Sequence, residues 1–391
     1  MTIQVVTIVL LGMAANIFTP LAPSLLGAMV DHQGMSVEVA GRLVSFNFLG
    51  GALASFVALF VLHRPGWNLR WTMLGCLLLA IATSLASIAV SDSYPALVAV
   101  RLLNGLGAGL GFTVACVAVI ATKRIERAYA VLYGSPFLIG GVGLALLPLV
   151  YRAGGIDGAF YVMAAINLFA IVLLPWFPRT VEGGGRNPEQ AASGATPVPV
   201  ALAGLMLLAL LLYYAFNSGI WAYIERMGVA SGMTPERVGA ILGPGMAAAI
   251  IGMIAASLLG DRIGYRKPIY IGVAAITIAT AAFLGSPSDL QFGIAAAVFN
   301  ASIPFVTPYM VTILALLVPS GMGVTAANIA TITGFSAGPL LISYFVADGR
   351  FTPAILATVA GFVVVWILLA LFMRGLRRQD GFERLKANCL A

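Results

Sequence analysis

Long runs of apolar residues, separated by short polar segments, follow one another along the whole chain. The runs are about twice as long as the roughly ten alternating residues of a transmembrane β-strand, so they predict helices rather than a barrel. A helix needs about 20 apolar residues to cross a hydrocarbon core of about 30 Å. The pattern therefore predicts twelve spans, at residues 5–30, 38–62, 71–90, 95–121, 128–151, 158–177, 200–226, 235–259, 268–284, 290–317, 323–346 and 352–373.

Composition also favours a membrane protein. Of the 391 residues, 61% are hydrophobic and 9% are charged, whereas a soluble domain is about 45–50% apolar and about 25% charged. The cysteines, Cys76, Cys116 and Cys389, form neither an even disulfide set nor a metal-ligand spacing. The sequence contains no G-x-x-x-x-G-K phosphate-binding loop. We therefore expect no metal, no cofactor and no ATP coupling, and a non-enzymatic protein.

Basic residues are concentrated on alternate loops, and such loops stay on the cytoplasmic side of a membrane. Fifteen of the 21 lie on one side: Arg64, Arg70, Lys123, Arg124, Arg127, Arg179, Arg186, Arg262, Arg266, Lys267, Arg374, Arg377, Arg378, Arg384 and Lys386. This asymmetry predicts a multi-pass protein of a bacterial-type inner membrane with both termini in the cytoplasm. The net charge of +7 then follows from topology and from attraction to anionic lipid, not from a nucleic-acid partner.

A polar segment rich in Gly, Pro and Ala, residues 179–199, is predicted to be a cytoplasmic linker. It separates an N-terminal bundle of six helices, 1–178, from a C-terminal one, 200–374, which a basic tail, 375–391, follows. The halves share weak similarity: residues 34–38 (GMSVE) align with 232–236 (GMTPE), 63–67 align with 261–265, and Asn104 aligns with Asn300. Such a parallel repeat places a binding site between two halves that rock against each other.

Three motifs resemble those of the major facilitator superfamily of transporters. Residues 260–268 (GDRIGYRKP) are similar to its cytoplasmic loop motif G-x-x-x-D-R-x-G-R-R, and residues 101–107 (RLLNGLG) to its R-x-x-x-G-x-G motif. Gly134-Ser135-Pro136 with Gly140-Gly141 is similar to a Gly-Pro-Gly-Gly motif of its antiporters. The first half departs from the loop motif, because His63 stands at the position of the aspartate and Leu62 at that of the preceding glycine.

The resemblance implies an all-α fold of two pseudo-symmetric six-helix bundles and transport by alternating access. It also implies a cytoplasmic latch in the loop motif, with the gating residues Gly260, Asp261, Arg262, Gly264 and Arg266. Short residues there allow a tight turn, and Asp261 can meet cations or a helix N-terminus across the interface. The alternative is a topogenic cluster in a tight turn.

Arg101 is the one charge deep in a predicted span, about 9 Å along the helix. Insertion scales assign such a residue about 2.5–3.5 kcal/mol, so it needs a partner or a wet cavity. We expect it to bind a substrate anion or to take part in proton coupling. The alternative is a structural arginine that bonds backbone carbonyls and lipid headgroups.

Span 200–226 carries a polar stripe of Tyr214, Asn217, Trp221 and Glu225, which fall within about 80° of arc. This face is predicted to line the cavity, with Glu225 as the candidate proton acceptor. Alternatively, Glu225 simply ends the helix at the outer surface. With polar residues of spans 5–30, 95–121 and 290–317 added, the predicted substrate-binding set is Asn16, Arg101, Asn104, Tyr214, Asn217, Trp221 and Asn300.

These features favour a proton-linked transporter, driven by the proton gradient, that exports a small lipophilic compound or metabolite. Span 5–30 lacks the buried acid of many drug antiporters of the family, which leaves symport and facilitated diffusion open. One alternative is uptake of an organic anion, such as a carboxylate, recognised by Arg101. A different-class alternative is a non-transporting receptor or a lipid-modifying enzyme, which would need a soluble domain or an interfacial cluster of His or acids. The expected partners are a small molecule and membrane lipids, with the protein acting as a monomer.

Overall fold

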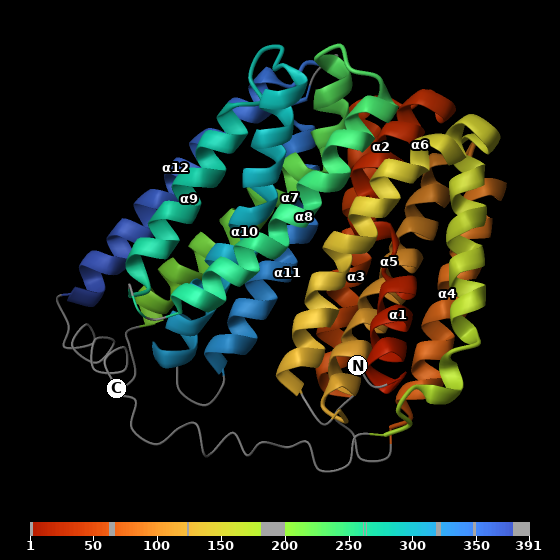
Figure 1. Ribbon diagram of the computed structural model, residues 1–391, viewed down its shortest axis with the longest axis horizontal. Helices are drawn as coiled ribbons and strands as arrows, with labels where there is room; N and C mark the ends of the chain where they lie inside the picture. Colours follow the sequence, from red (N-terminus) through yellow and green to blue (C-terminus); the bar gives the residue numbers. More distant parts are fainter. Residues whose placement is uncertain are drawn as a thin grey trace. The chain divides into compact units, whose positions relative to one another are not determined.

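The computed structural model describes residues 3–61, 67–122, 125–180, 200–260, 262, 264–317, 322–346 and 349–377. The described chain is helical, and the predicted all-α class is confirmed (Figure 1). The elements are α1 (Ile3–Ala15), α2 (Phe18–Gln33), α3 (Val37–Val61), α4 (Leu69–Ala89), α5 (Tyr94–Val119), α6 (Ile125–Ile171), the 3-10 helix η1 (Leu174–Trp176), α7 (Val200–Ala230), α8 (Pro235–Leu259), α9 (Arg266–Ala281), α10 (Asp289–Leu317), α11 (Met322–Ser343) and α12 (Thr352–Arg377).

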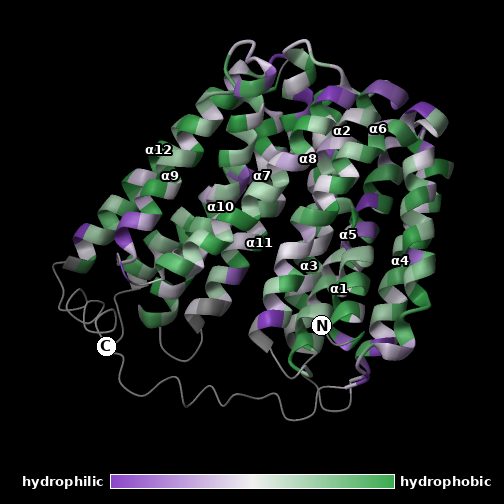
Figure 2. Cartoon of the chain, viewed as in Figure 1, coloured by the Kyte–Doolittle hydropathy of each residue, from purple (hydrophilic) through white to green (hydrophobic). Residues whose placement is uncertain are grey.

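Each predicted span coincides with a helical segment of the described chain, and Figure 2 shows hydrophobic residues along most of the helix lengths. Within the described residues, ten segments are long and apolar enough to cross a membrane. Two predicted spans fall on α6, which has 47 residues and non-helical backbone at Gly154 and Gly155. At 1.5 Å per residue such a helix would be about 70 Å long, more than twice the hydrocarbon core. Figure 1 shows the chain reversing direction within α6.

The first predicted span is interrupted between α1 and α2, at Asn16 and Ile17. Pro20 and Pro23 lack the N–H groups that would bond to the carbonyls of Asn16 and Thr19 in a continuous helix. The side chain of Thr19 donates instead to Asn16 Oδ1 at 2.7 Å. The prolines therefore account for the break in the helix, which lies one turn before Pro20.

The chain divides into two compact units. Unit 1 comprises residues 1–184, 222–229 and 234–243, and unit 2 comprises residues 185–221, 230–233 and 244–391. The last turns of α7 and the first turns of α8 therefore belong with the N-terminal helices. The domain limits expected at 178 and 200 remain a prediction, because residues 181–199 of the linker lie outside the described residues, as do residues 378–391 of the tail.

Glycines allow helices α3 and α5 of unit 1 to approach closely. A Cβ atom added to Gly105 would collide with the backbone of Asn47, and one added to Gly109 would collide with the backbone of Gly51. Because helix interfaces in membranes gain most of their attraction from close packing, small residues are favoured there. This contact fixes α5, and with it Arg101 and Asn104, against α3.

Candidate functional site

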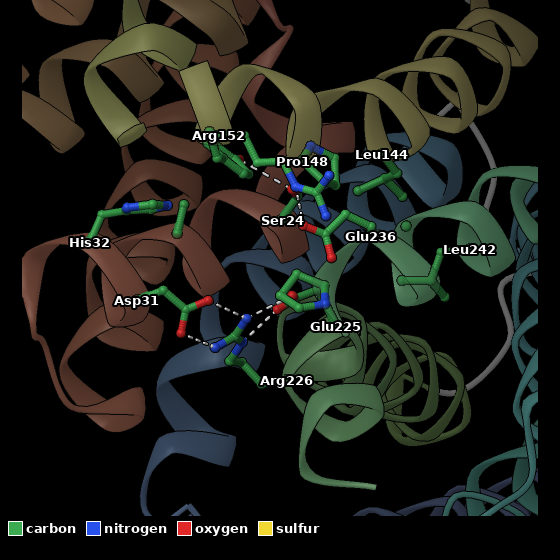
Figure 3. Close-up of a pocket in the computed structure, with 14 residues that line it drawn as sticks. Ser24, Asp31, His32, Leu144, Pro148, Arg152, Glu225, Arg226, Glu236 and Leu242 are labelled. Carbon is green, nitrogen blue, oxygen red and sulfur yellow. Dashed lines mark hydrogen bonds and ion pairs between the residues drawn. The ribbon is translucent and has the colours of Figure 1, made fainter. Parts of the chain in front are cut away.

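A cavity of about 230 Å³ lies in unit 1, where α2, α6, the end of α7 and the start of α8 meet (Figure 3). Five charged side chains line it: Asp31, Arg152, Glu225, Arg226 and Glu236. Apolar residues complete the wall, among them Leu144 and Leu242. At about 30 Å³ per water molecule the cavity has room for roughly seven waters. The cavity therefore has room for water that can hydrate the charged groups along its wall.

Arg226 lies between two carboxylates in this cavity (Figure 3). Its Nη1 and Nη2 atoms donate to Oδ1 and Oδ2 of Asp31 at 2.7 and 2.9 Å. Its Nε and Nη2 atoms donate to Oε2 and Oε1 of Glu225 at 2.6 and 2.7 Å. The guanidinium therefore makes a two-point contact with each acid, the geometry in which arginine binds carboxylates most strongly.

The charges of this triad do not cancel. When Asp31, Glu225 and Arg226 are all ionised, two negative charges face one positive charge. The side chains of Glu225 and Arg226 are each 6% exposed, whereas that of Asp31 is 42% exposed. Removing a carboxylate from water is costly unless it is paired. The excess negative charge thus sits beside a buried acid, where one proton would neutralise the group.

A second ion pair lies at the same cavity. Arg152 Nε of α6 donates to Glu236 Oε1 of α8 at 2.8 Å, and the two side chains are 67% and 33% exposed. Ser24 donates to the hydroxyl of Tyr151 at 3.1 Å, and the ring of His32 lies 5.9 Å from that of Tyr151. An exposed ion pair such as that of Arg152 and Glu236 contributes about 0–1 kcal/mol to the free energy of unfolding. It joins α6 to α8 and contributes little to stability.

Glu225 lines this cavity, and α7 continues beyond it to Ala230. Glu225 is therefore buried and does not end α7, and its placement in a transport pathway or near the outer surface remains a prediction. Its role as a proton acceptor remains a prediction. The sequence analysis did not identify Asp31, Arg152 or Glu236 as residues of the site.

Arg101 is buried inside unit 1, with 1% of its surface exposed. Its guanidinium carbon lies 5.2 Å from the ring centre of Phe18 and 5.1 Å from that of Phe160. Nη2 donates to the hydroxyl of Ser87. Within the described part of the chain, Nε and Nη1 have no hydrogen-bond partner. The side chain is therefore held by aromatic rings, while the N–H groups of two of its nitrogens, Nε and Nη1, have no partner among the described residues.

A buried amide network continues from Arg101. Asn47 Nδ2 donates to Asn104 Oδ1 at 2.8 Å and to the carbonyl of Arg101 at 3.1 Å. Asn104 Nδ2 donates to Thr83 Oγ1 at 2.8 Å. Asn104, a predicted substrate contact, thus ties together α3, α4 and α5. Its predicted contact with substrate is not tested by this arrangement.

The predicted site residues fall in both units. Asn16, Arg101 and Asn104 belong to unit 1, whereas Tyr214, Asn217, Trp221 and Asn300 belong to unit 2.

In unit 2, the hydroxyls of Tyr214 and Thr307 lie 2.9 Å apart and join α7 to α10. Asn217 is buried, and its Nδ2 has no partner among the residues that the structure describes; the same is true of the hydroxyl of Tyr213. Trp221 is also buried, and Asn300 Nδ2 donates to the carbonyl of Ala296 on its own helix. Tyr213 was not predicted, because it lies off the stripe that defined the polar face.

The loop motif is only partly described. Gly260 and Gly264 have φ angles of 47° and 70°, in the left-handed region that favours glycine, so they form the tight turn between α8 and α9. Arg266 begins α9, with its guanidinium carbon 5.6 Å from the ring centre of Tyr270. Arg262 is exposed. Asp261 lies outside the described residues, as do His63, Lys123 and Arg124, so the latch remains a prediction.

Comparison with known proteins agrees with the motifs. The sequence model of the Major Facilitator Superfamily matches residues 5–324. Among solved structures, the chain is similar to the nucleoside transporter NupG, with 12% identity, coverage of 96% of this chain and 99% of that chain, and a TM-score of 0.72.

It is also similar to a D-xylose-proton symporter, with 14% identity, coverage of 94% and 95%, and a TM-score of 0.70. For an inward open conformation of the xylose transporter XylE from E. coli the values are 13%, 93% and 95%, and 0.68. No curated protein matches the chain. Identities this low show the fold alone.

Proposed function

The chain belongs to the Major Facilitator Superfamily, and we propose that it is a proton-linked transporter that exports a small organic molecule. As a member of this family it is a multi-pass membrane transporter that works by alternating access, not an enzyme. The proposal adds the coupling ion and the direction. The observation that carries it is the sharing of Arg226 by Glu225 and Asp31.

Sharing one guanidinium links protonation to movement. Any motion that separates α7 from α2 breaks the contact between Arg226 and Asp31 and changes the charge around Glu225. An ionised carboxylate in a spanning helix is expensive, and a proton removes most of that cost. Glu225 is therefore proposed to take up a proton when the triad opens and to release it when Arg226 returns.

The proposed direction and location rest on sequence features. The positive-inside asymmetry supports a bacterial-type inner membrane with cytoplasmic termini. With a cytoplasmic N-terminus, as proposed, helices α1 and α2 (Ile3–Gln33) would carry Asp31 and the cavity to the outer end of that span. Protons entering from outside would then reach Glu225 first, which suits proton-driven transport in either direction. Export is favoured by the resemblance of Gly134-Ser135-Pro136 with Gly140-Gly141 to the antiporter motif. The protein is proposed to act as a monomer with the proton gradient as its energy source.

Proteoliposomes with an imposed pH gradient test the proposal. A panel of lipophilic compounds is added, and proton movement is followed with a pH-sensitive dye. We expect substrate-dependent proton movement in the natural protein and none in Glu225→Gln, which should still exchange labelled substrate across the membrane. Glu236→Gln is the matched control, because that acid lines the same cavity but is more exposed. Unchanged proton movement in Glu225→Gln would contradict the assignment.

A second candidate is proton-linked uptake of an organic anion. It is favoured by Arg101, whose Nε and Nη1 groups have no partner in the described chain and which could receive a carboxylate. Uptake of carboxylates that is lost in Arg101→Gln, with export of neutral compounds absent, would favour this candidate over the first.

A further inference from the structure

Exposed apolar side chains of unit 1 end in tryptophans where α6 finishes and α4 begins. Phe169 and Val172, in the last turn of α6 and just beyond it, are 73% and 66% exposed, and Trp176 of η1 lies about one turn further along. Trp176 and Trp71 of α4 are 48% and 68% exposed. Tryptophan is enriched in membrane proteins at the level of the lipid headgroups. The two indoles therefore indicate where the hydrocarbon core meets the headgroup layer.

Hydrogen bonds join the start of α4 to the segment that contains η1. Arg70 donates from Nε to the carbonyl of Phe177 at 3.1 Å. Its Nη2 donates to the carbonyls of Pro175 and Phe177 at 2.8 and 2.7 Å. The backbone N–H of Leu69 donates to the carbonyl of Arg179 at 2.8 Å. The two segments therefore lie side by side and form one surface.

This surface, the α4–η1 junction, comprises residues 69–72 and 175–179 and is positively charged. It contains two arginines and no acidic residue. Among the described residues, neither Arg70 Nη1 nor the exposed side chain of Arg179 has a hydrogen-bond or ion-pair partner. The N-terminal end of α4, which carries a partial positive charge, adds to the field. The junction therefore offers free donors to an anion.

We propose that the α4–η1 junction binds the phosphate group of an anionic phospholipid. Arg70 and Arg179 donate to the phosphate oxygens, and Trp71 and Trp176 lie beside the upper part of the acyl chains. The exposed apolar side chains next to the arginines favour a lipid over a free phosphate. The inference rests on membership of a family of membrane proteins and is independent of the proposed proton coupling and direction of transport.

The two arginines suit a lipid phosphate for physical reasons. A guanidinium group can bind phosphate through two parallel hydrogen bonds. Three hydrogen bonds to carbonyls already fix Arg70, so binding costs it little conformational freedom. Basic residues near a bilayer surface are attracted to anionic lipid, and salt screens this attraction. The junction should therefore select lipids by the charge of their headgroup.

Tryptophan fluorescence in bilayers of defined composition tests the site. The full chain is reconstituted with Trp67, Trp221 and Trp366 replaced by phenylalanine, so that Trp71 and Trp176 are the reporters. Phosphatidylglycerol with brominated acyl chains, which quenches tryptophan on contact, replaces part of a phosphatidylcholine bilayer, and brominated phosphatidylcholine is the reference. We expect stronger quenching by phosphatidylglycerol at equal mole fraction, and we expect the preference to weaken with added salt.

Arg179→Gln is the test variant, because the hydrogen bond from Leu69 goes to the backbone of residue 179 and does not need its side chain. The preference for phosphatidylglycerol should fall about fivefold, the factor that corresponds to about 1 kcal/mol for one basic residue near the surface. Arg179→Lys keeps the charge and should keep most of the preference. Arg374→Gln is the matched control, because it removes an exposed arginine from α12, in unit 2, and should change nothing.

Equal quenching by the two lipids in the parent chain would overturn the proposal without any variant. A preference that survives Arg179→Gln, or that falls as much in Arg374→Gln, would also overturn it. Glycerol phosphate in the buffer supplies the headgroup without acyl chains, and relief of quenching by this compound would show a site for free phosphate instead. The measurement uses neither substrate nor pH gradient, so failure of proton coupling at Glu225 would leave its result unaffected.

Discussion

Arg226 binds Asp31 through both of its terminal nitrogens, at 2.7 and 2.9 Å, although the two residues are 195 positions apart in the sequence. The contact joins the end of α2 to the end of α7. Asp31 is the more exposed acid of the triad, and Glu225 is the buried one. Because the two ion pairs of Arg226 differ in their access to water, breaking one or both should have different effects on stability.

We predict that Arg226→Gln destabilises the protein far more than Asp31→Asn does. Loss of the guanidinium leaves Glu225 buried with no cation, a change of about 3–5 kcal/mol for a broken buried pair. Loss of the Asp31 charge leaves Arg226 and Glu225 balanced. Thermal unfolding of the purified variants in detergent measures both effects. Equal losses would mean that Asp31, not Glu225, is the main partner of Arg226.

The ion pair between Arg152 and Glu236 should contribute little to stability. Both side chains reach solvent, and an exposed pair contributes about 0–1 kcal/mol and weakens with salt. We expect Arg152→Ala to lower the melting temperature slightly at low salt and not at all at high salt. A large loss that persists at high salt would show that the pair is shielded from water.

The amide network around Asn104 should be sensitive to the loss of Asn47. Asn47→Ala removes the donor to both Asn104 Oδ1 and the carbonyl of Arg101, and an unsatisfied buried polar group costs about 1–3 kcal/mol. Asn300→Ala is the matched control, because the Nδ2 atom of Asn300 donates to a carbonyl of its own helix, that of Ala296. Melting temperatures should fall clearly in the first variant and little in the second. The reverse order would show that Asn300 makes the more important contacts.

These contacts mark the limit of what the sequence could predict. The length of the apolar runs is enough to locate the spans, because the bilayer sets the length of each helix. Gly154 and Gly155 did not stand out, because the sequence only required a turn somewhere between residues 151 and 158. The pairing of Arg226 with Asp31 depends on the rotation and height of two distant helices, which periodicity within one span does not define.

Glu225 and Arg101 were found because each is a rare charge in an apolar run. The partners of Arg101 were missed because nothing in the sequence distinguishes them. Phe18, Phe160 and Ser87 are ordinary residues of membrane helices, and only packing brings them to Arg101.

Arg101 gives a prediction in which stability and transport move in opposite directions. Among the described residues, no acid forms a hydrogen bond with Arg101. The free-energy cost of removing its charge from water is therefore not offset by an ion pair. Each of the two cation–π contacts stabilises the guanidinium by about 0.5–2 kcal/mol, and Ser87 accepts one hydrogen bond. Arg101→Met keeps an unbranched, apolar side chain between the rings of Phe18 and Phe160 while removing the charge. We expect its melting temperature to equal or exceed that of the natural protein.

Arg101→Lys should be the least stable of the three proteins, because a compact ammonium is more strongly hydrated than a guanidinium and cannot stack on two rings at once. If Arg101 also contacts substrate or takes part in coupling, both variants should lose gradient-driven transport despite their different stabilities. That combination is the signature of a residue kept for function at the expense of stability. Should Arg101→Met instead melt as early as Arg101→Lys and still transport normally, Arg101 is a structural residue that holds α2, α5 and α6 together.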